Sequence, residues 1–275
     1  MPTDLPPAQL SAFEGFAVEL ARAAGAAILP LFRNENGLED KGAAKGLAFD
    51  PVTAADRGAE AAIRQVIAAR FPEHGVLGEE YGEDRPDAEF VWVLDPIDGT
   101  RGFIAGVPLW TTLIALRHRG EPVLGLIAQP YLDEIFVGTA LGSRLIHRDG
   151  TRPLQVKPCE GLAHAIVGVT DPQAYFREDE QRAFQGVRDA ARLTRLGGDA
   201  YYFAMAALGT MDVVVEPAAC HAWDVEAAIP LIAGAGGFMT NWRGEPVGRH
   251  GGQVVLAGDR RCLDEALALL APAAD

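Results

Sequence analysis

The sequence predicts an α/β protein of the α+β kind, with closely spaced strands in its first half and alternating strands and helices in its second. Two helices come first, because apolar residues recur at helical spacing from Leu10 to about Phe32 and again from Asp56 to Ala69. The intervening segment Asn34–Asp50 is expected to be a loop. Four short apolar runs follow in close succession, which predicts a meandering antiparallel sheet. These runs are Val91–Leu94, Thr111–Arg117, Pro122–Gln129 and Glu134–Thr139.

The segment after about Arg152 alternates between strand and helix patterns, which indicates a sheet covered by helices. The expected strands are Ala165–Val169, Met211–Val215 and Gln253–Ala257. The expected helices are Gln181–Arg192, Ala200–Leu208, Asp224–Ala233 and Arg261–Leu270. Pro230 should kink the helix that begins at Asp224, and the glycine-rich residues 234–237 should end it. We therefore expect a single unit in two halves, residues 1–150 and 151–275.

Composition limits the classes of partner. A chain of 275 residues with 49% hydrophobic content can bury a substantial core, and its net charge of −14 argues against an open nucleic-acid-binding surface. No apolar stretch approaches the ~20 residues that span a bilayer, and the first residues lack the basic region of a signal peptide. Three cysteines without metal-binding spacing are typical of a reducing compartment. We expect a cytoplasmic protein with no membrane or nucleic-acid partner.

The most informative motif is the hexapeptide from Asp95 to Thr100, Asp-Pro-Ile-Asp-Gly-Thr, which directly follows the apolar run Phe90–Leu94. Two carboxylates about 4 Å apart repel by roughly 4 kcal/mol at an effective dielectric of ~20, so a turn that carries Asp95 and Asp98 requires a cation or solvent. The backbone N–H groups at its Gly-Thr end suit a phosphate where a helix could start. The motif suggests metal-assisted phosphate chemistry, although Asp-Pro and Asp-Gly are also ordinary turn formers.

Three further acids lie at the ends of predicted elements. Glu79 follows a short apolar run, while Asp56 and Asp224 begin helices. Each has a structural alternative: a solvated strand end for Glu79, a complement to the helix dipole for Asp56, and an N-cap for Asp224. Alone, none of these acids indicates a function.

Together with the hexapeptide, the order of these acids along the chain resembles the inositol monophosphatase superfamily of Mg²⁺-dependent, lithium-sensitive sugar and alcohol phosphatases. The resemblance covers nearly the whole chain. It implies a layered α-β-α-β-α sandwich of the inositol monophosphatase and fructose-1,6-bisphosphatase type, usually a homodimer, with two or three Mg²⁺ ions per active site between the two halves. The implied reaction is hydrolysis of a small phosphomonoester by a water molecule.

The resemblance also implies residue roles. The metal would be bound by four carboxylates and one backbone carbonyl. The carboxylates are those of Glu79, Asp95, Asp98 and Asp224, and the carbonyl is that of Ile97. The catalytic groups would be Glu79 with the dyad of Thr100 and Asp56, which orients the attacking water. The phosphate would be bound by the N–H groups of Gly99 and Thr100 and by Lys45. Lys45 equally fits a solvated lysine in a Gly- and Ala-rich loop.

The substrate implied is L-histidinol phosphate, an intermediate of histidine biosynthesis. The hexapeptide continues as Arg101-Gly102-Phe103, which resembles the histidinol-phosphate phosphatase branch, whereas inositol-specific members tend to have Thr-Asn-Phe there. Asp199 and Glu216 match positions at the leaving-group end of the pocket. A carboxylate there can bind the amine or imidazole of the substrate.

Each of these assignments has an alternative. Asp199 also fits a helix cap, and Glu216 also fits a simple strand end. The residues before Asp224, His221-Ala222-Trp223, are closer to the inositol-type members, since histidinol enzymes usually have Tyr there. The alternative substrates are therefore inositol 1-phosphate and other small sugar or nucleotide phosphates. The alternative class is a catalytically silent metal- or metabolite-binding protein that keeps the fold.

Overall fold

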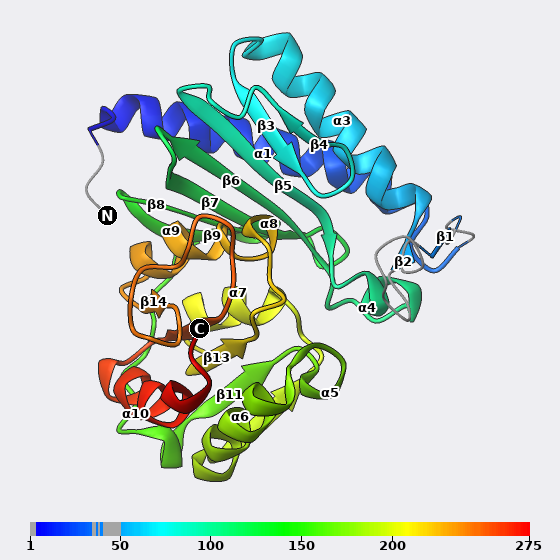
Figure 1. Ribbon diagram of the computed structural model, residues 1–275. Coiled ribbons are helices and arrows are strands. Elements are labelled where there is room, and N and C mark those ends of the chain that lie inside the picture. The colour runs from blue at the N-terminus through cyan, green and yellow to red at the C-terminus, as the bar shows by residue number, and fades with distance from the viewer. Residues whose placement is uncertain (1–3, 35–36, 38, 41–50) are drawn as a thin grey trace.

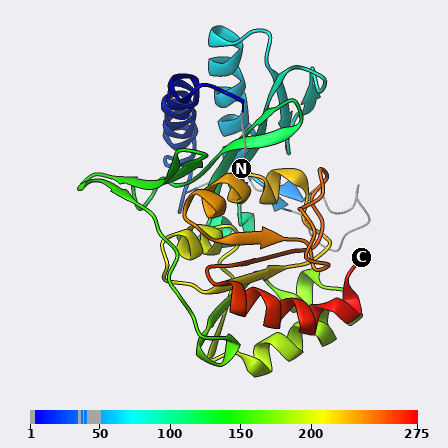
Figure 2. The same ribbon diagram turned by 90° about the vertical axis from the view of Figure 1, so that its left-hand side faces the viewer.

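The computed structural model describes residues 4–34, 37, 39–40 and 51–275. Its elements form layers in the order helix, sheet, helix, sheet, helix (Figure 1), and the layers are seen edge-on in Figure 2. This confirms the predicted α-β-α-β-α sandwich. Of the predicted loop, most residues, Lys45 among them, lie outside the described part of the chain.

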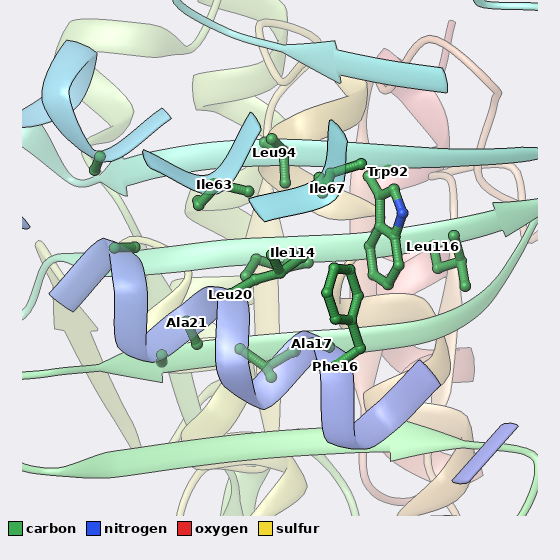
Figure 3. Packing of buried hydrophobic residues seen from close by; sticks show 14 of the residues in the cluster. Phe16, Ala17, Leu20, Ala21, Ile63, Ile67, Trp92, Leu94, Ile114 and Leu116 are labelled. Carbon is green, nitrogen blue, oxygen red and sulfur yellow. The ribbon is translucent and has the colours of Figure 1, made fainter. Parts of the chain in front are cut away.

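The first layer consists of α1 (Pro7–Ile28) and α3 (Ala54–Arg70), which pack on one face of the larger sheet. Figure 3 shows the contact: apolar residues of α1 and α3 lie on those of the strands beneath. Phe16 meets Trp92 edge-on, with ring centroids 5.4 Å apart. The helical spacing of these side chains therefore buries one face of each helix, as the periodicity predicts.

The larger sheet has eight strands in the order β10-β9-β8-β7-β6-β5-β3-β4. The predicted meander is confirmed from β5 onward, where neighbours pair antiparallel, whereas β3 and β5 are parallel. The strands are β3 (Gly75–Gly78), β4 (Gly82–Asp84), β5 (Phe90–Asp98), β6 (Thr111–His118), β7 (Glu121–Gln129), β8 (Glu134–Thr139), β9 (Gly142–His147) and β10 (Gly150–Pro153). A short helix, α4 (Thr100–Ile104), follows β5, and the small pair β1 (Glu39–Asp40) and β2 (Pro51–Val52) precedes α3.

The smaller sheet has five strands in the order β12-β11-β13-β15-β14. Its strands are β11 (Ile166–Val169), β12 (Leu193–Leu196), β13 (Val213–Glu216), β14 (Phe238–Thr240) and β15 (Val254–Ala257). Between the sheets lie α7 (Tyr201–Ala207), α8 (Ala222–Val225) and α9 (Ala228–Gly234). The last layer holds α6 (Glu178–Ala190) and α10 (Arg260–Leu270), while α5 (Pro172–Tyr175) links β11 to α6. Short 3₁₀ turns occupy Leu162–His164 and Ala271–Ala273.

The predicted helix Asp224–Ala233 is in fact two helices, α8 and α9, with Glu226 and Ala227 between them. Pro230 lies in the first turn of α9, where its missing N–H is tolerated. The predicted kink is thus a complete break before the proline. The glycine-rich stop is confirmed, since α9 ends at Gly234.

Within the described ranges, the search for a helix with the length and apolarity to cross a bilayer finds none.

Candidate active site

Asp95 and Asp98 both lie on β5, because the strand runs on to Asp98 instead of ending at Leu94. The pairing of β5 with β6 loses its register between these two aspartates. Pro96, which cannot donate to a ladder, sits in that irregularity, and its carbonyl accepts a hydrogen bond of 2.8 Å from the Thr112 hydroxyl. The predicted turn is therefore a bulged strand end, which presents both carboxylates on the same side of the molecule as α8.

The third carboxylate comes from α8, more than a hundred residues further along the chain. Oxygen atoms of Asp95, Asp98 and Asp224 all lie within 4.8 Å of one another. Asp224 is not the N-cap of its helix: it is the third residue after the cap, and its Oδ2 accepts a bond of 2.6 Å from the His221 N–H. Asp98 Oδ2 accepts a bond of 2.7 Å from the Ala200 N–H. The larger sheet and the helix layer between the sheets thus contribute to one acidic cluster.

The cluster is electrostatically unbalanced. Burial raises the pKa of Asp95 well above its usual value, and the charges of Glu79, Asp98 and Asp224 raise it further. Burial also raises the pKa of Asp98. Asp95 Oδ1 is buried and has no hydrogen-bond partner among the described residues. A buried oxygen without a donor, surrounded by carboxylates, fits a hard divalent cation such as Mg²⁺, which prefers oxygen ligands.

Glu79 and Ile97 lie beside this cluster. Glu79 directly follows β3, and its N–H donates to the carbonyl of Leu94 at 3.2 Å, next to Asp95. Ile97 is buried on β5, and its carbonyl accepts a bond of 3.1 Å from the Thr100 hydroxyl. The charge of Glu79 raises the pKa of Asp95, so Glu79 lies near the cluster. The roles of Glu79 and Ile97 that the resemblance implies stay predictions.

Asp56 is buried on the first turn of α3, where it forms a capping box with Thr53. Its Oδ2 accepts bonds from the N–H of Thr53, at 2.8 Å, and from the Thr53 hydroxyl. Burial raises the pKa of Asp56 to about 6, against the effect of these bonds. Asp56 therefore also has a structural role, because it caps and stabilises the N-terminus of α3. Its dyad with Thr100 stays a prediction.

The predicted phosphate-binding site, the N–H groups of Gly99 and Thr100, lies at the start of α4. Gly99 is the N-cap and has a left-handed backbone, with φ of 80°, which favours glycine. In the part of the chain that is described, no side chain caps this helix, so its first N–H groups remain for an anion. A Cβ on Gly99 would lie 3.0 Å from Asp199 Oδ2. The predicted phosphate-binding site is therefore adjacent to Asp199, at the predicted leaving-group end of the pocket.

Asp199 and Glu216 come together from separate elements. Asp199 precedes α7 with a positive φ of 43° and is not its side-chain cap, while Glu216 ends β13 and is only 4% exposed. Burial raises the pKa of Asp199 to about 6, although the Arg101 charge lowers it. Burial also raises the pKa of Glu216 well above its usual value. Both charges in turn raise the pKa of Asp98, so they face the acidic cluster.

Three neighbours of the site carried no recognised signal in the sequence. Thr170 donates to Glu216 Oε1 through its N–H and its hydroxyl, each at 2.9 Å. Cys220 lies close enough to Asp224 and Glu216 for their charges to raise the pKa of its thiol, after the larger effect of burial. Glu60 is one turn after Asp56 on α3, and this spacing alone could have marked it as a residue of the same face. The other two depend on contacts between distant segments.

The layered fold, with two carboxylates of β5 and one of α8 gathered beside a helix start, is that of a phosphatase of phosphoric monoesters. The sequence profile of the inositol monophosphatase family matches residues 9–274, and the chain belongs to this family. Enzymes of this family use Mg²⁺.

Individual relatives differ in the substrate that they are named for. The chain is 37% identical to the chloroplastic bifunctional phosphatase IMPL2 of Arabidopsis thaliana, over 89% of this chain and 68% of the relative. It is 34% identical to a histidinol-phosphatase of Mycobacterium tuberculosis, over 74% and 79%. Among solved structures, an inositol monophosphatase from Zymomonas mobilis is 37% identical and superposes with a TM-score of 0.80, covering 93% of this chain and 96% of that one.

Proposed function

We propose that this protein is a Mg²⁺-dependent phosphomonoesterase that hydrolyses L-histidinol phosphate to L-histidinol and phosphate. The observation that carries the metal dependence is the convergence of the Asp95, Asp98 and Asp224 carboxylates, together with the buried Asp95 Oδ1, which has no hydrogen-bond partner among the described residues. Asp95, Asp98, Asp224 and Glu79 would hold the metal. Bound Mg²⁺ would supply charge neutralisation for the phosphoryl group and acidification of a water molecule.

The chain's own groups supply the remaining chemistry. The N–H groups of Gly99 and Thr100 bind phosphoryl oxygens at the start of α4. Asp56, whose pKa burial raises to about 6 in the metal-free protein, would accept the proton that the attacking water loses, either directly or through the Thr100 hydroxyl. A base with a pKa near the working pH is the most effective in this role.

The substrate assignment rests on Asp199 and Glu216. Glu216 is buried and Asp199 is partly buried, and the charge of Asp199 raises the pKa of Glu216. At the leaving-group end that the resemblance implies, such a pair favours a leaving group that carries positive charge, because an ammonium or imidazolium would relieve the desolvation of the carboxylates and their mutual repulsion. L-Histidinol has both an amine and an imidazole. Inositol is neutral and offers only hydroxyl donors, which makes inositol 1-phosphate the second candidate. The chain is similar both to an enzyme named for histidinol phosphate and to one named for inositol phosphate, so both substrates need to be tested.

Phosphate release across a panel of esters tests the substrate. With saturating Mg²⁺, kcat/KM for L-histidinol phosphate should exceed that for inositol 1-phosphate by at least about tenfold, which is about 1.4 kcal/mol of discrimination. The opposite preference would overturn the histidinol assignment. Activity that survives complete chelation of divalent cations would overturn the metal dependence.

Two substitutions assign the preference to its residues. Asp199→Asn and Glu216→Gln should each reduce kcat/KM for histidinol phosphate more than for inositol 1-phosphate. Asp212→Asn is the matched control. Asp212 is as deeply buried as Glu216 but directly precedes the first residue of β13, whereas Glu216 is its last, and Asp212 accepts a hydrogen bond from the Ile166 N–H at 2.8 Å. It should leave the ratio of the two substrates unchanged.

We infer two further properties from the family resemblance alone: a place in histidine biosynthesis and a homodimer. Complementation of a strain that lacks histidinol-phosphate phosphatase activity tests the first. Light scattering coupled to size-exclusion chromatography tests the second, since a dimer of this 29.3 kDa chain has twice that mass.

A further inference from the structure

The turn between β3 and β4, residues 79–81, is held by a buried glutamate from α3. The Glu60 side chain is fully buried. Its Oε2 accepts the N–H of Glu80 at 2.8 Å, and its Oε1 accepts the N–H of Tyr81 at 3.2 Å. A carboxylate buried to this degree is stable only when it is hydrogen-bonded and its charge is balanced. The two N–H groups that it binds immediately follow Glu79.

Arg64, one helical turn further along α3, balances that charge and closes the arrangement. Its Nε donates to Glu60 Oε1 at 2.7 Å, and its Nη2 donates to the carbonyl of Gly82, on the other side of the turn. We call Glu60 and Arg64 together the α3 clamp. Gly78 leaves the space that the clamp occupies, since a Cβ at that position would overlap the Glu60 carboxylate.

The clamp lies beside the acidic cluster. Asp56 precedes Glu60 by one turn on the same face of α3, and both side chains are buried. On the strand side, the N–H of Glu79 is bonded to the Leu94 carbonyl, next to Asp95. The backbone of Glu79 is therefore fixed on one side by β5, and the residues after it are fixed by α3.

We propose that Glu60 is a positioning residue for Mg²⁺ binding, which acts by holding the Glu79–Tyr81 turn so that the Glu79 carboxylate faces Asp95. This inference rests on the proposed function, in which Glu79 is a metal ligand. Without the clamp, two N–H groups of a part-buried turn lose their acceptor, and the turn relaxes toward water. Groups that orient metal ligands in this indirect way typically change metal affinity or activity by about 10–100-fold when removed.

The first test measures Mg²⁺ binding to the metal-free protein by isothermal titration calorimetry, in the absence of substrate. Glu60→Gln should raise the Kd for Mg²⁺ by about 10–100-fold, while kcat at saturating Mg²⁺ stays within a few-fold of the wild type. Glu14→Gln is the matched control, because Glu14 is a buried glutamate of α1 that pairs with Arg144 far from the cluster. It should lower the Tm and leave the Kd unchanged.

A double-mutant cycle separates positioning of Glu79 from general stabilisation. If Glu60 acts through Glu79, Glu60→Gln should add little to the loss of Mg²⁺ affinity in a Glu79→Gln background. Effects that multiply would overturn the inference, as would an unchanged Kd in Glu60→Gln. If Glu60→Gln does not fold, Arg64→Met takes its place, with a smaller shift in the same direction expected. A wild-type protein that binds Mg²⁺ but releases no phosphate would contradict the proposed function and leave the clamp to be judged by binding.

Discussion

A buried ion pair anchors the helix that carries Asp224 to the larger sheet. Arg117 on β6 donates from Nε to both carboxylate oxygens of Glu226, at 3.0 and 2.8 Å, and from Nη2 to the same carboxylate. Glu226 directly follows α8. The Nη2 atom also donates to the Arg249 carbonyl at 3.2 Å. The side chains of Arg117 and Glu226 are only 8% and 4% exposed.

Arg117→Met should therefore be strongly destabilising, since it leaves the carboxylate of Glu226 buried without its cation. Breaking a buried pair in this way costs about 3–5 kcal/mol. An unfolding entropy of about 2.1 cal/mol/K per residue, or about 0.6 kcal/mol/K for this chain, converts that loss into a fall in Tm of about 5–9 °C. The double variant Arg117→Met/Glu226→Leu should recover most of the loss, because no buried charge remains.

Thermal unfolding followed by circular dichroism measures this effect. Arg70→Met is the matched control: Arg70 pairs with Glu19 at 3.1 Å, but both side chains are about half exposed, so its loss should cost less than about 1 kcal/mol. The reasoning would be refuted if Arg117→Met lowered the Tm no more than Arg70→Met. A double variant as unstable as Arg117→Met alone would show that the stranded charge is not the cause.

Three further predictions concern the site. Asp95→Asn should reduce kcat by about a thousandfold or more, since several kcal/mol of charge stabilisation depend on it; near-normal turnover in a phosphate-release assay would contradict the metal assignment. In the metal-free protein, pKa values of about 6 for Asp56 and Asp199 lie above those of the unfolded chain. The stability they contribute is present at low pH and is lost as the pH rises through about 6. Asp199→Asn should thus flatten the fall in Tm between pH 4 and 8, and an unaltered slope would exclude this origin. Gly78→Ala should lower the free energy of unfolding by about 1–3 kcal/mol, because the added Cβ overlaps the Glu60 carboxylate. If denaturant unfolding gave an unchanged free energy, the Glu60 side chain would be able to move aside at little cost.

Much of the fold was predictable from local patterns. The strands β6, β7 and β8 match their predicted bounds to within one residue, because apolar runs bounded by turn residues are properties of short segments. β12 was not predicted, because it lacks such a run. It is an edge strand whose Leu193 and Leu196 are each 48% exposed, so its sequence has no pattern of buried apolar residues. The break between α8 and α9 was foreseen only as a kink, since a proline marks a disturbance without setting its extent.

The acids of the site were visible in the sequence by themselves, since the hexapeptide and the order of Asp56, Glu79 and Asp224 could be recognised without coordinates. Their electrostatic state was not, because a pKa depends on burial and on charges that arrive from distant segments. Only the tertiary structure brought the Asp224 carboxylate to within 4.8 Å of those on β5. It alone paired Arg117 with Glu226, 109 residues away. Residue types and local elements are encoded over a few positions, whereas the balance of buried charge is decided when those elements pack.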